Sequence, residues 1–197
     1  MNDTSHAKDL TLDIGCGSTP RGSINVDARR LDGVDVVCSA LHLPFADSSF
    51  SKVLLSHVIE HFTYANAAKL LLEARRVLVQ SGRLDIWTPN FQSLSLLKAW
   101  LLGAPKDSLM VYPPLTGDQD YKENVHLSQF TADLLAKYVK REGFEVLRLR
   151  GEGDYRGIMM PLQVFTRVFP SRGGVIHLTA QPKGKNEVDS LAHPLRQ

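Results

Sequence analysis

Hydrophobic positions along this chain form short runs, interrupted by two stretches with helical spacing. Continuous or alternating apolar residues predict strands at Leu10–Ile14, Ser23–Val26, Val34–Cys38, Lys52–Ser56, Arg83–Thr88, Phe144–Leu149 and Gly174–Gln181. From Tyr64 to about Val79 apolar side chains recur every three or four residues, which predicts an amphipathic helix that Ser81-Gly82 ends. Thr131, with Asp133 in the first turn, predicts the start of a second helix, which Gly143 closes.

This alternation of strands and helices is typical of an α/β sheet with helices on both faces. A chain of 197 residues fits one domain with a substantial buried core. We therefore expect a single domain over 9–182. A flexible polar N-terminus at 1–8 precedes it, and a flexible polar tail at 183–197 follows it.

Two glycines follow the first predicted strand, in Leu-Asp-Ile-Gly-Cys-Gly from Leu12 to Gly17. Glycine suits a sharp turn where backbone must approach a ligand without a Cβ in the way. The second strand ends in Asp27, which is placed to bind the two hydroxyls of a ribose. The pattern indicates a nucleoside-containing cofactor at the carboxyl ends of parallel strands.

The step between the two motifs is short. Only Ser18 to Ile24 separates Gly17 from Asn25, whereas a crossover with a full helix needs a dozen or more residues. We expect the first crossover helix to be shortened or missing. A nicotinamide-dependent oxidoreductase remains the less favoured alternative, because the third glycine of its fingerprint is absent and Asp27 comes too soon.

An ordered set of motifs over residues 10–150 resembles class I S-adenosylmethionine-dependent methyltransferases of the small, type-11-like group. The motifs are Leu12–Gly17, Val26–Ala28, Val36–Phe50, Ser56–Phe62, Arg75–Leu84, Thr88–Asn90, His126–Thr131 and Glu142–Phe144. The short first crossover is also similar to a subgroup associated with polysaccharide biosynthesis. The resemblance implies a doubly wound, mostly parallel seven-stranded sheet of Rossmann-like type, whose last strand is antiparallel.

The resemblance also implies roles for individual residues. Asp13 and the backbone of Gly15, Cys16 and Gly17 would meet the methionine end of S-adenosylmethionine, and Asp27 would bind its ribose. Ser39, Ala40 and Leu41 would lie along the adenine, and Ser56 and His57 near the sulfonium and the acceptor. The family usually has aspartate where this chain has Ser39. The loss of that charge predicts weaker cofactor binding.

Methyl transfer to a hydroxyl benefits from a general base, and histidine is the usual choice. His57 and His126 are the leading candidates. His57, Glu60 and His61 also have a spacing that can bind zinc, but this spacing arises readily by chance. We therefore expect no metal, and expect Glu60 or His61 to cap or pack locally.

Residues 91–127 join the fifth strand to the next helix and are longer than a plain connector. They are a candidate lid over the site, and a structural flap or an oligomer contact stays open as the alternative. Tyr155 to Arg172 is apolar enough to pack or to pair with another subunit, so a homodimer also stays open.

Composition narrows the function only slightly. A formal charge of +2 gives no case for nucleic acid, and no apolar run is long enough to span a membrane. Cys16 and Cys38 fit neither a disulfide framework nor a zinc pattern. We expect a cytoplasmic methyltransferase that transfers a methyl group to an oxygen or nitrogen of a small molecule or sugar, with S-adenosylhomocysteine as product. A non-catalytic partner subunit with the same fold is the alternative.

Overall fold

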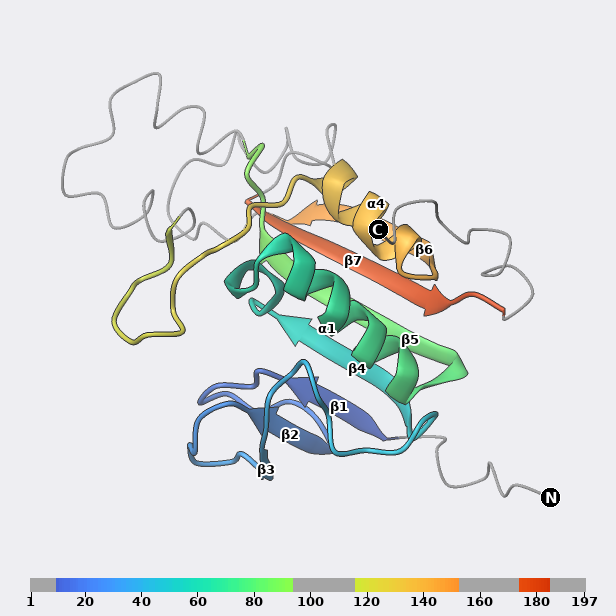
Figure 1. Ribbon diagram of the computed structural model, residues 1–197. Coiled ribbons are helices and arrows are strands. Elements are labelled where there is room, and N and C mark those ends of the chain that lie inside the picture. The colour runs from blue at the N-terminus through green and yellow to red at the C-terminus, as the bar shows by residue number, and fades with distance from the viewer. Residues whose placement is uncertain (1–9, 94–115, 153–173, 185–197) are drawn as a thin grey trace.

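The computed structural model describes residues 10–93, 116–152 and 174–184, which form one seven-stranded sheet (Figure 1). The strand order is β3-β2-β1-β4-β5-β7-β6. Neighbouring strands from β3 to β5 run parallel, and β7 runs antiparallel to both β5 and β6. The sheet therefore winds outward in both directions from β1 and β4, and the expectation of a mostly parallel sheet with an antiparallel last strand is confirmed.

The elements follow the predicted runs closely. The strands are β1 Thr11–Ile14, β2 Ile24–Asp27, β3 Val36–Val37, β4 Phe50–Ser56, β5 Leu78–Pro89, β6 Phe144–Glu152 and β7 Val175–Pro182. The helices are η2 Ile59–His61, a single 3-10 turn, α1 Tyr64–Val77 and α4 Ala132–Arg141. Residues 94–115 of the candidate lid, the segment Tyr155–Arg172 and nearly all of the two termini lie outside the described residues.

The two α-helices in the described residues, α1 and α4, each begin at a threonine cap. The Thr63 side chain accepts from the amide of Asn66, and the Thr131 side chain accepts from that of Leu134. Each helix packs an apolar stripe on the same face of the sheet, where their buried side chains join one core cluster (Figure 1). No described helix covers the opposite face, which instead carries polar side chains such as Lys52 and Asp85, 2.9 Å apart.

The end of α1 differs from the prediction. The helix stops at Val77 and β5 begins at once at Leu78, so Ser81-Gly82 lies inside the strand, and the helix end predicted there is wrong. The register between β4 and β5 shifts between Phe50↔Leu78 and Lys52↔Arg83, so β5 accommodates the extra residues as a bulge. The apolar Leu78 fits the helical pattern and the strand equally well, which is why the pattern extended the helix.

The first crossover contains no helix, as predicted. Gly22 is the residue that allows so short a return. A Cβ there would lie 2.6 Å from the carbonyl oxygen of Ile24 and 2.8 Å from the amide nitrogen of Asp13, both of them backbone atoms. The amide of Ser23 then donates to the carbonyl of Thr11 at 2.8 Å, so the chain turns directly from the loop into β2. No described helix is long and apolar enough to cross a membrane.

Candidate functional site

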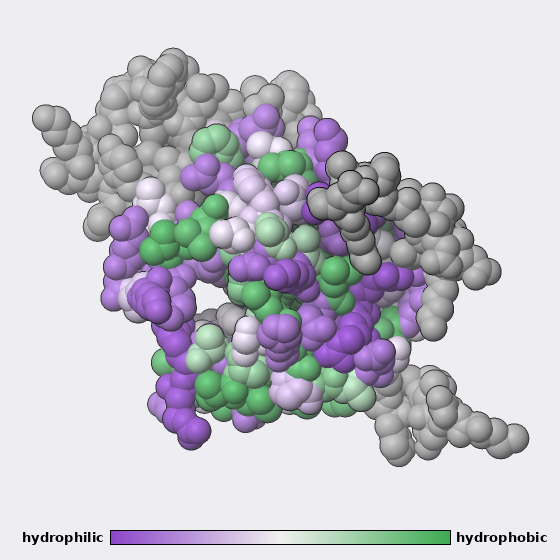
Figure 2. Space-filling view, viewed as in Figure 1, coloured by the Kyte–Doolittle hydropathy of each residue, from purple (hydrophilic) through white to green (hydrophobic). Residues whose placement is uncertain are grey.

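A cavity of about 1260 Å³ lies at the carboxyl ends of β1, β2 and β4. Its walls come from the β1–β2 loop, the end of β2, residues 38–40, the segment from Ser56 to Phe62, and part of 120–127. Figure 2 shows the hollow between the hydrophilic 116–127 segment and the body of the molecule. In an open α/β sheet this crevice is the usual ligand site.

Gly15 and Gly17 shape the floor of the cavity. Both have left-handed backbone, with φ of 66° and 58°. The amides of Gly15 and Cys16 donate to the carbonyl of Val26 at 2.8 and 3.1 Å, which holds the loop against β2. A Cβ on Gly15 would lie 2.7 Å from Val58, whereas one on Gly17 would meet nothing within 4 Å. The backbone is therefore open to a ligand at Gly17.

Asp27 closes this loop from the end of β2. Its Oδ2 accepts from the amide of Gly17 at 3.0 Å, and its Oδ1 accepts from the amide of Arg29 at 2.9 Å. The side chain is 8% exposed and lines the cavity. Arg29 Nε also donates to Oδ1 at 3.3 Å. Because a carboxylate offers about four lone-pair positions, Asp27 keeps room for a further hydrogen bond from a diol.

Asp13 lies outside the cavity lining and is fully buried. Its Oδ2 accepts from the amide of Arg21 at 2.9 Å, while Oδ1 has no hydrogen-bond partner. Burial raises the pKa of Asp13, and the hydrogen bond from Arg21 opposes this effect. Within the described chain Asp13 holds the β1–β2 loop, and Arg21 stands between it and the cavity.

The expected adenine segment is divided between cavity and core. Ser39 and Ala40 line the cavity, whereas Leu41 packs against the hydrophobic core. The Ser39 hydroxyl oxygen accepts from the amide of Leu41 at 3.2 Å and so stabilises the turn. Nearby, the thiol of Cys16 has a pKa raised to about 11, chiefly by burial and then by the charges of Asp13 and Asp27.

The other end of the cavity begins at Ser56 and His57, which follow β4 and line the wall. His57 has left-handed backbone at φ 55°, a conformation that a non-glycine residue adopts at a cost. Its amide donates to the carbonyl of Trp87 at 2.8 Å. His57 Nδ1 lies 3.3 Å from Oε1 of Glu60, and half of the imidazole is exposed.

Glu60, for which the sequence predicted only local capping or packing, lies at the centre of several contacts. It is 2% exposed, and its Oε2 accepts from the Thr88 hydroxyl at 3.0 Å. Its backbone carbonyl accepts from the amides of Leu127 and Ser128 at 2.8 and 3.1 Å. These bonds fix the connection before α4 beside η2.

This connection brings His126 next to His61, although the two are far apart in the sequence. Their ring centroids lie 5.0 Å apart, and the rings are nearly perpendicular. His61 lines the cavity, as do the neighbours of His126, Val125 and Leu127. His57 and His126 are the two histidines predicted as bases. Both lie near Glu60, although His57 precedes η2 in the sequence and His126 follows it by more than sixty residues.

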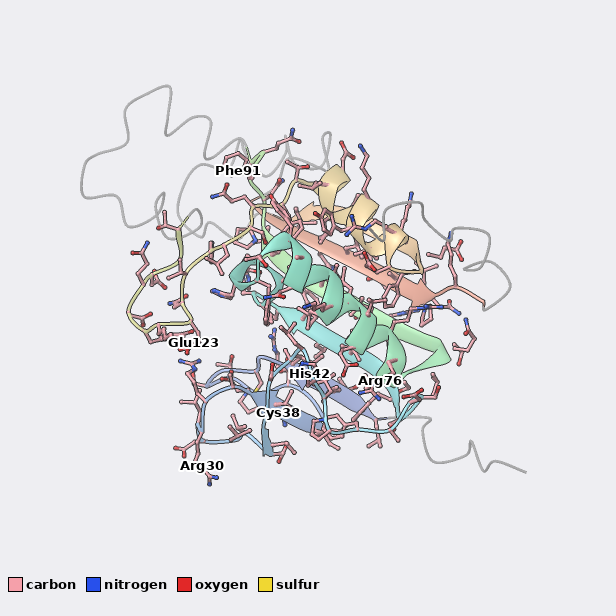
Figure 3. All side chains as sticks on the ribbon, viewed as in Figure 1. Arg30, Cys38, His42, Arg76, Phe91 and Glu123 are labelled. Carbon is pink, nitrogen blue, oxygen red and sulfur yellow. The ribbon has the colours of Figure 1, made fainter. Side chains whose placement is uncertain are left out.

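Part of the described portion of the predicted lid, residues 116–127, lines the cavity. The guanidinium of Arg29 makes a cation–π contact with Tyr121, with its Cζ 3.9 Å from the ring centroid. Figure 3 shows Glu123 at the tip of this segment, on the side where the β2–β3 connection carries Arg30. Neither Arg29 nor Tyr121 was predicted as a site residue, because a pair between distant loops leaves no pattern in the sequence.

Comparison with known proteins gives the same fold. A family described as a methyltransferase domain matches residues 21–86. A structure of an S-adenosylmethionine-dependent methyltransferase from Thermotoga maritima, titled a possible histamine N-methyltransferase, superimposes with a TM-score of 0.61 and 18% identity. That match covers 88% of this chain and 82% of the other. The fold is therefore the Rossmann-like methyltransferase fold.

Two curated relatives match part of the chain. The demethylmenaquinone methyltransferase of Thermotoga maritima is 30% identical over 132 residues, which cover 61% of this chain and 54% of that protein. An uncharacterized protein of Methanocaldococcus jannaschii is 32% identical over 99 residues, 43% of each chain. This chain thus spans about half the length of the curated relatives that it matches.

Proposed function

We propose that the protein is an S-adenosylmethionine-dependent methyltransferase that acts on an oxygen or nitrogen of a small molecule or a saccharide-like acceptor. One observation carries the proposal. A single cavity joins the glycine loop and Asp27 at one end to His57 and His61 at the other. A nucleoside cofactor and an acceptor would then share one space, and about 1260 Å³ exceeds the usual volume of a pocket for one small ligand.

The residues at the glycine end fit the cofactor. Gly17 leaves open space where a Cβ would otherwise stand, and its backbone faces the cavity. Asp27 keeps acceptor capacity for the ribose hydroxyls while holding the loop through Gly17. Ser39 and Ala40 continue the same wall toward the place expected for adenine.

Within this proposal, Asp13 supports the loop from below rather than contacting the cofactor directly. Its buried Oδ2 fixes Arg21, which itself lines the cavity. Leu41 has a comparable supporting role through its contact with the core. Both residues would influence cofactor affinity through the shape of the neighbouring loops.

At the other end, the chain supplies groups that can take up a proton. S-adenosylmethionine supplies an activated methyl group when bound, so the protein's main task is to orient the acceptor. His57 lies at the cavity wall with its imidazole half exposed, which suits a general base. The cover formed by residues 120–127 would hold the acceptor and exclude water.

A transfer assay tests the proposal. The protein is incubated with S-adenosylmethionine labelled in its methyl group and with matched panels of sugars, phenols and amines. We expect label in an oxygen- or nitrogen-containing acceptor, and less label with His57→Ala at unchanged cofactor affinity. Cofactor binding without transfer to any acceptor would favour the non-catalytic partner subunit. Hydride transfer to a nicotinamide cofactor would overturn the proposal.

A further inference from the structure

We propose that Glu60, His61 and His126 bind a divalent transition-metal ion of the zinc class, with coordination positions left for an oxygen of the acceptor. One ligand atom of each residue lies within 4.8 Å of the others. Two imidazoles and one carboxylate form a donor set that suits Zn²⁺ and similar ions, and such a set leaves positions for other ligands. This departs from the expectation of no metal, which considered only the residues near His57 in sequence.

The carboxylate of Glu60 is buried and has one oxygen available to a cation. Glu60 is 2% exposed, and its Oε1 is buried without a hydrogen-bond partner. The Thr88 hydroxyl holds the other oxygen, Oε2, at 3.0 Å and so fixes the orientation of the group. A buried carboxylate oxygen without a partner is costly, and a bound cation removes that cost. His57 Nδ1 lies 3.3 Å from this oxygen but makes no hydrogen bond with it.

A backbone carbonyl orients the imidazole of His61. His61 Nδ1 lies 3.3 Å from the carbonyl oxygen of Val125, which can only accept a hydrogen bond. His61 in its neutral form therefore carries its proton on Nδ1 and keeps a lone pair on Nε2. A backbone carbonyl that fixes the tautomer in this way is a regular partner of metal-binding histidines.

His126 is held in place by backbone on both sides. Its own amide donates to the carbonyl of Thr116 at 3.0 Å, and the next amide, of Leu127, donates to the carbonyl of Glu60. Ligands of a tetrahedral zinc ion lie about 3.3 Å from one another, given bonds of about 2.0 to 2.1 Å. Small rotations of the three side chains would close the present cluster to that spacing.

The location suggests what the ion would do. His61 lines the cavity beside His57, so an ion in this cluster lies at the acceptor end. An acceptor hydroxyl bound there would lose its proton to a base more easily. Its oxygen would form the bond to the methyl carbon as the methyl–sulfur bond breaks and leaves its electron pair on sulfur. The ion keeps its oxidation state. This part of the inference rests on the proposed function, whereas binding of the ion does not.

The experiment measures metal binding without cofactor or acceptor. Tag-free protein is treated with chelator, exchanged into metal-free buffer and titrated with Co²⁺, whose visible absorption reports imidazole coordination. We expect one Co²⁺ per chain and displacement by Zn²⁺. Glu60→Gln and His126→Ala should each weaken binding about tenfold or more, because loss even of an outer partner costs about 10- to 100-fold. The exposed His42, which belongs neither to the cavity lining nor to the cluster, supplies the control His42→Ala, which should bind Co²⁺ normally.

Equal Co²⁺ binding by His126→Ala and the unsubstituted protein would overturn the site, as would binding of less than one equivalent. Circular dichroism of each variant distinguishes the loss of a ligand from the loss of the fold. His126 is less buried than Glu60, so His126→Ala still tests the site if Glu60→Gln does not fold. A parallel titration with S-adenosylhomocysteine keeps the two proposals apart. Cofactor binding without Co²⁺ binding contradicts only the metal site, and the reverse result contradicts only the proposed function.

Discussion

The carboxylate of Asp27 and the amide of Gly17 are joined by a 3.0 Å hydrogen bond that closes a loop of only ten residues. The same side chain is the expected ribose ligand, so one group would both hold the loop and bind the cofactor. The cofactor end of the cavity therefore depends on the short crossover, in which Gly22 packs directly against backbone of β1 and β2.

Replacing Asp27 with asparagine should weaken S-adenosylhomocysteine binding by about 1–3 kcal/mol, the range of a lost charge-assisted hydrogen bond. Asparagine can still accept from Gly17, so the loop should keep its conformation. Isothermal titration measures the difference. The matched control is Asp35→Asn, because Asp35 also accepts from an amide ten residues away, that of Asn25 at 2.8 Å, but lies outside the cavity lining. Equal losses in both variants would contradict the role of Asp27 in the site.

The two glycines should respond differently to alanine. At Gly17 the added methyl group meets no neighbour, so Gly17→Ala should cost only about 1–2 kcal/mol for its left-handed backbone. Its methyl group would stand in the cavity and lower cofactor affinity about tenfold or more. At Gly15 the methyl group would lie 2.7 Å from Val58, so Gly15→Ala should lose more stability. Urea unfolding and calorimetry on both variants test this contrast, and the opposite order of stabilities would refute it.

Cys16 should resist alkylation at neutral pH although it lines the cavity. Its pKa is raised to about 11, so only about one thiol in a thousand is ionised at pH 8. The rate of reaction with iodoacetamide, followed by peptide mass spectrometry, should rise about tenfold per pH unit up to the pKa. S-adenosylhomocysteine should slow it further. Rapid modification at pH 7 would show that the thiol is less buried than the structure indicates.

Arg76 connects α1 to the segment that follows Ser39. It donates to both oxygens of Glu73, to Asp47, and to the carbonyls of Leu43 and Phe45. Arg76→Ala should therefore lower the free energy of unfolding by about 1–3 kcal/mol at pH 7. Arg141→Ala, which removes a more exposed guanidinium that among the described residues forms an ion pair only with the neighbouring Glu142, should lower it by about 1 kcal/mol or less. Similar losses in the two variants would contradict this role of Arg76.

The same contacts predict an acid dependence. The hydrogen bond from Arg76 lowers the pKa of Glu73 from its ordinary value of 4.5. A group whose pKa is lower in the folded state stabilises the fold above its unfolded pKa, and this contribution is lost as pH falls through the folded pKa. The stability difference between Glu73→Gln and the unsubstituted protein should thus be largest at pH 6–7 and shrink below about pH 4. A difference that does not change with pH would argue against this pairing.

Much of the fold could be predicted because its signals are local. Runs of apolar residues predicted each strand in the described part of the chain, and the seven residues after Gly17 left no room for a helix. The end of α1 could not be predicted, because Leu78 continues the helical stripe while it starts β5. The position of Asp13 follows from strand alternation, since its neighbours Leu12 and Ile14 are both buried in the core cluster. The contact with the methionine end of the cofactor, which the family resemblance implies for Asp13, stays a prediction.

The acceptor end was the least predictable part. The family resemblance implied a place near the acceptor for His57, whereas nothing in the sequence places His126 beside His61. That proximity depends on the bonds from Leu127 and Ser128 to the carbonyl of Glu60, which form only when the connection before α4 folds over η2. The contact of Arg29 with Tyr121 likewise joins loops that are distant in sequence.

Calorimetric titration with S-adenosylhomocysteine tests the central claim most directly. We predict one binding site per chain for the unsubstituted protein, with affinity reduced about tenfold or more in Gly17→Ala and unchanged in Asp35→Asn. Absence of binding at about 1 mM ligand, the upper end of common KM values, would contradict the assignment of this cavity to S-adenosylmethionine.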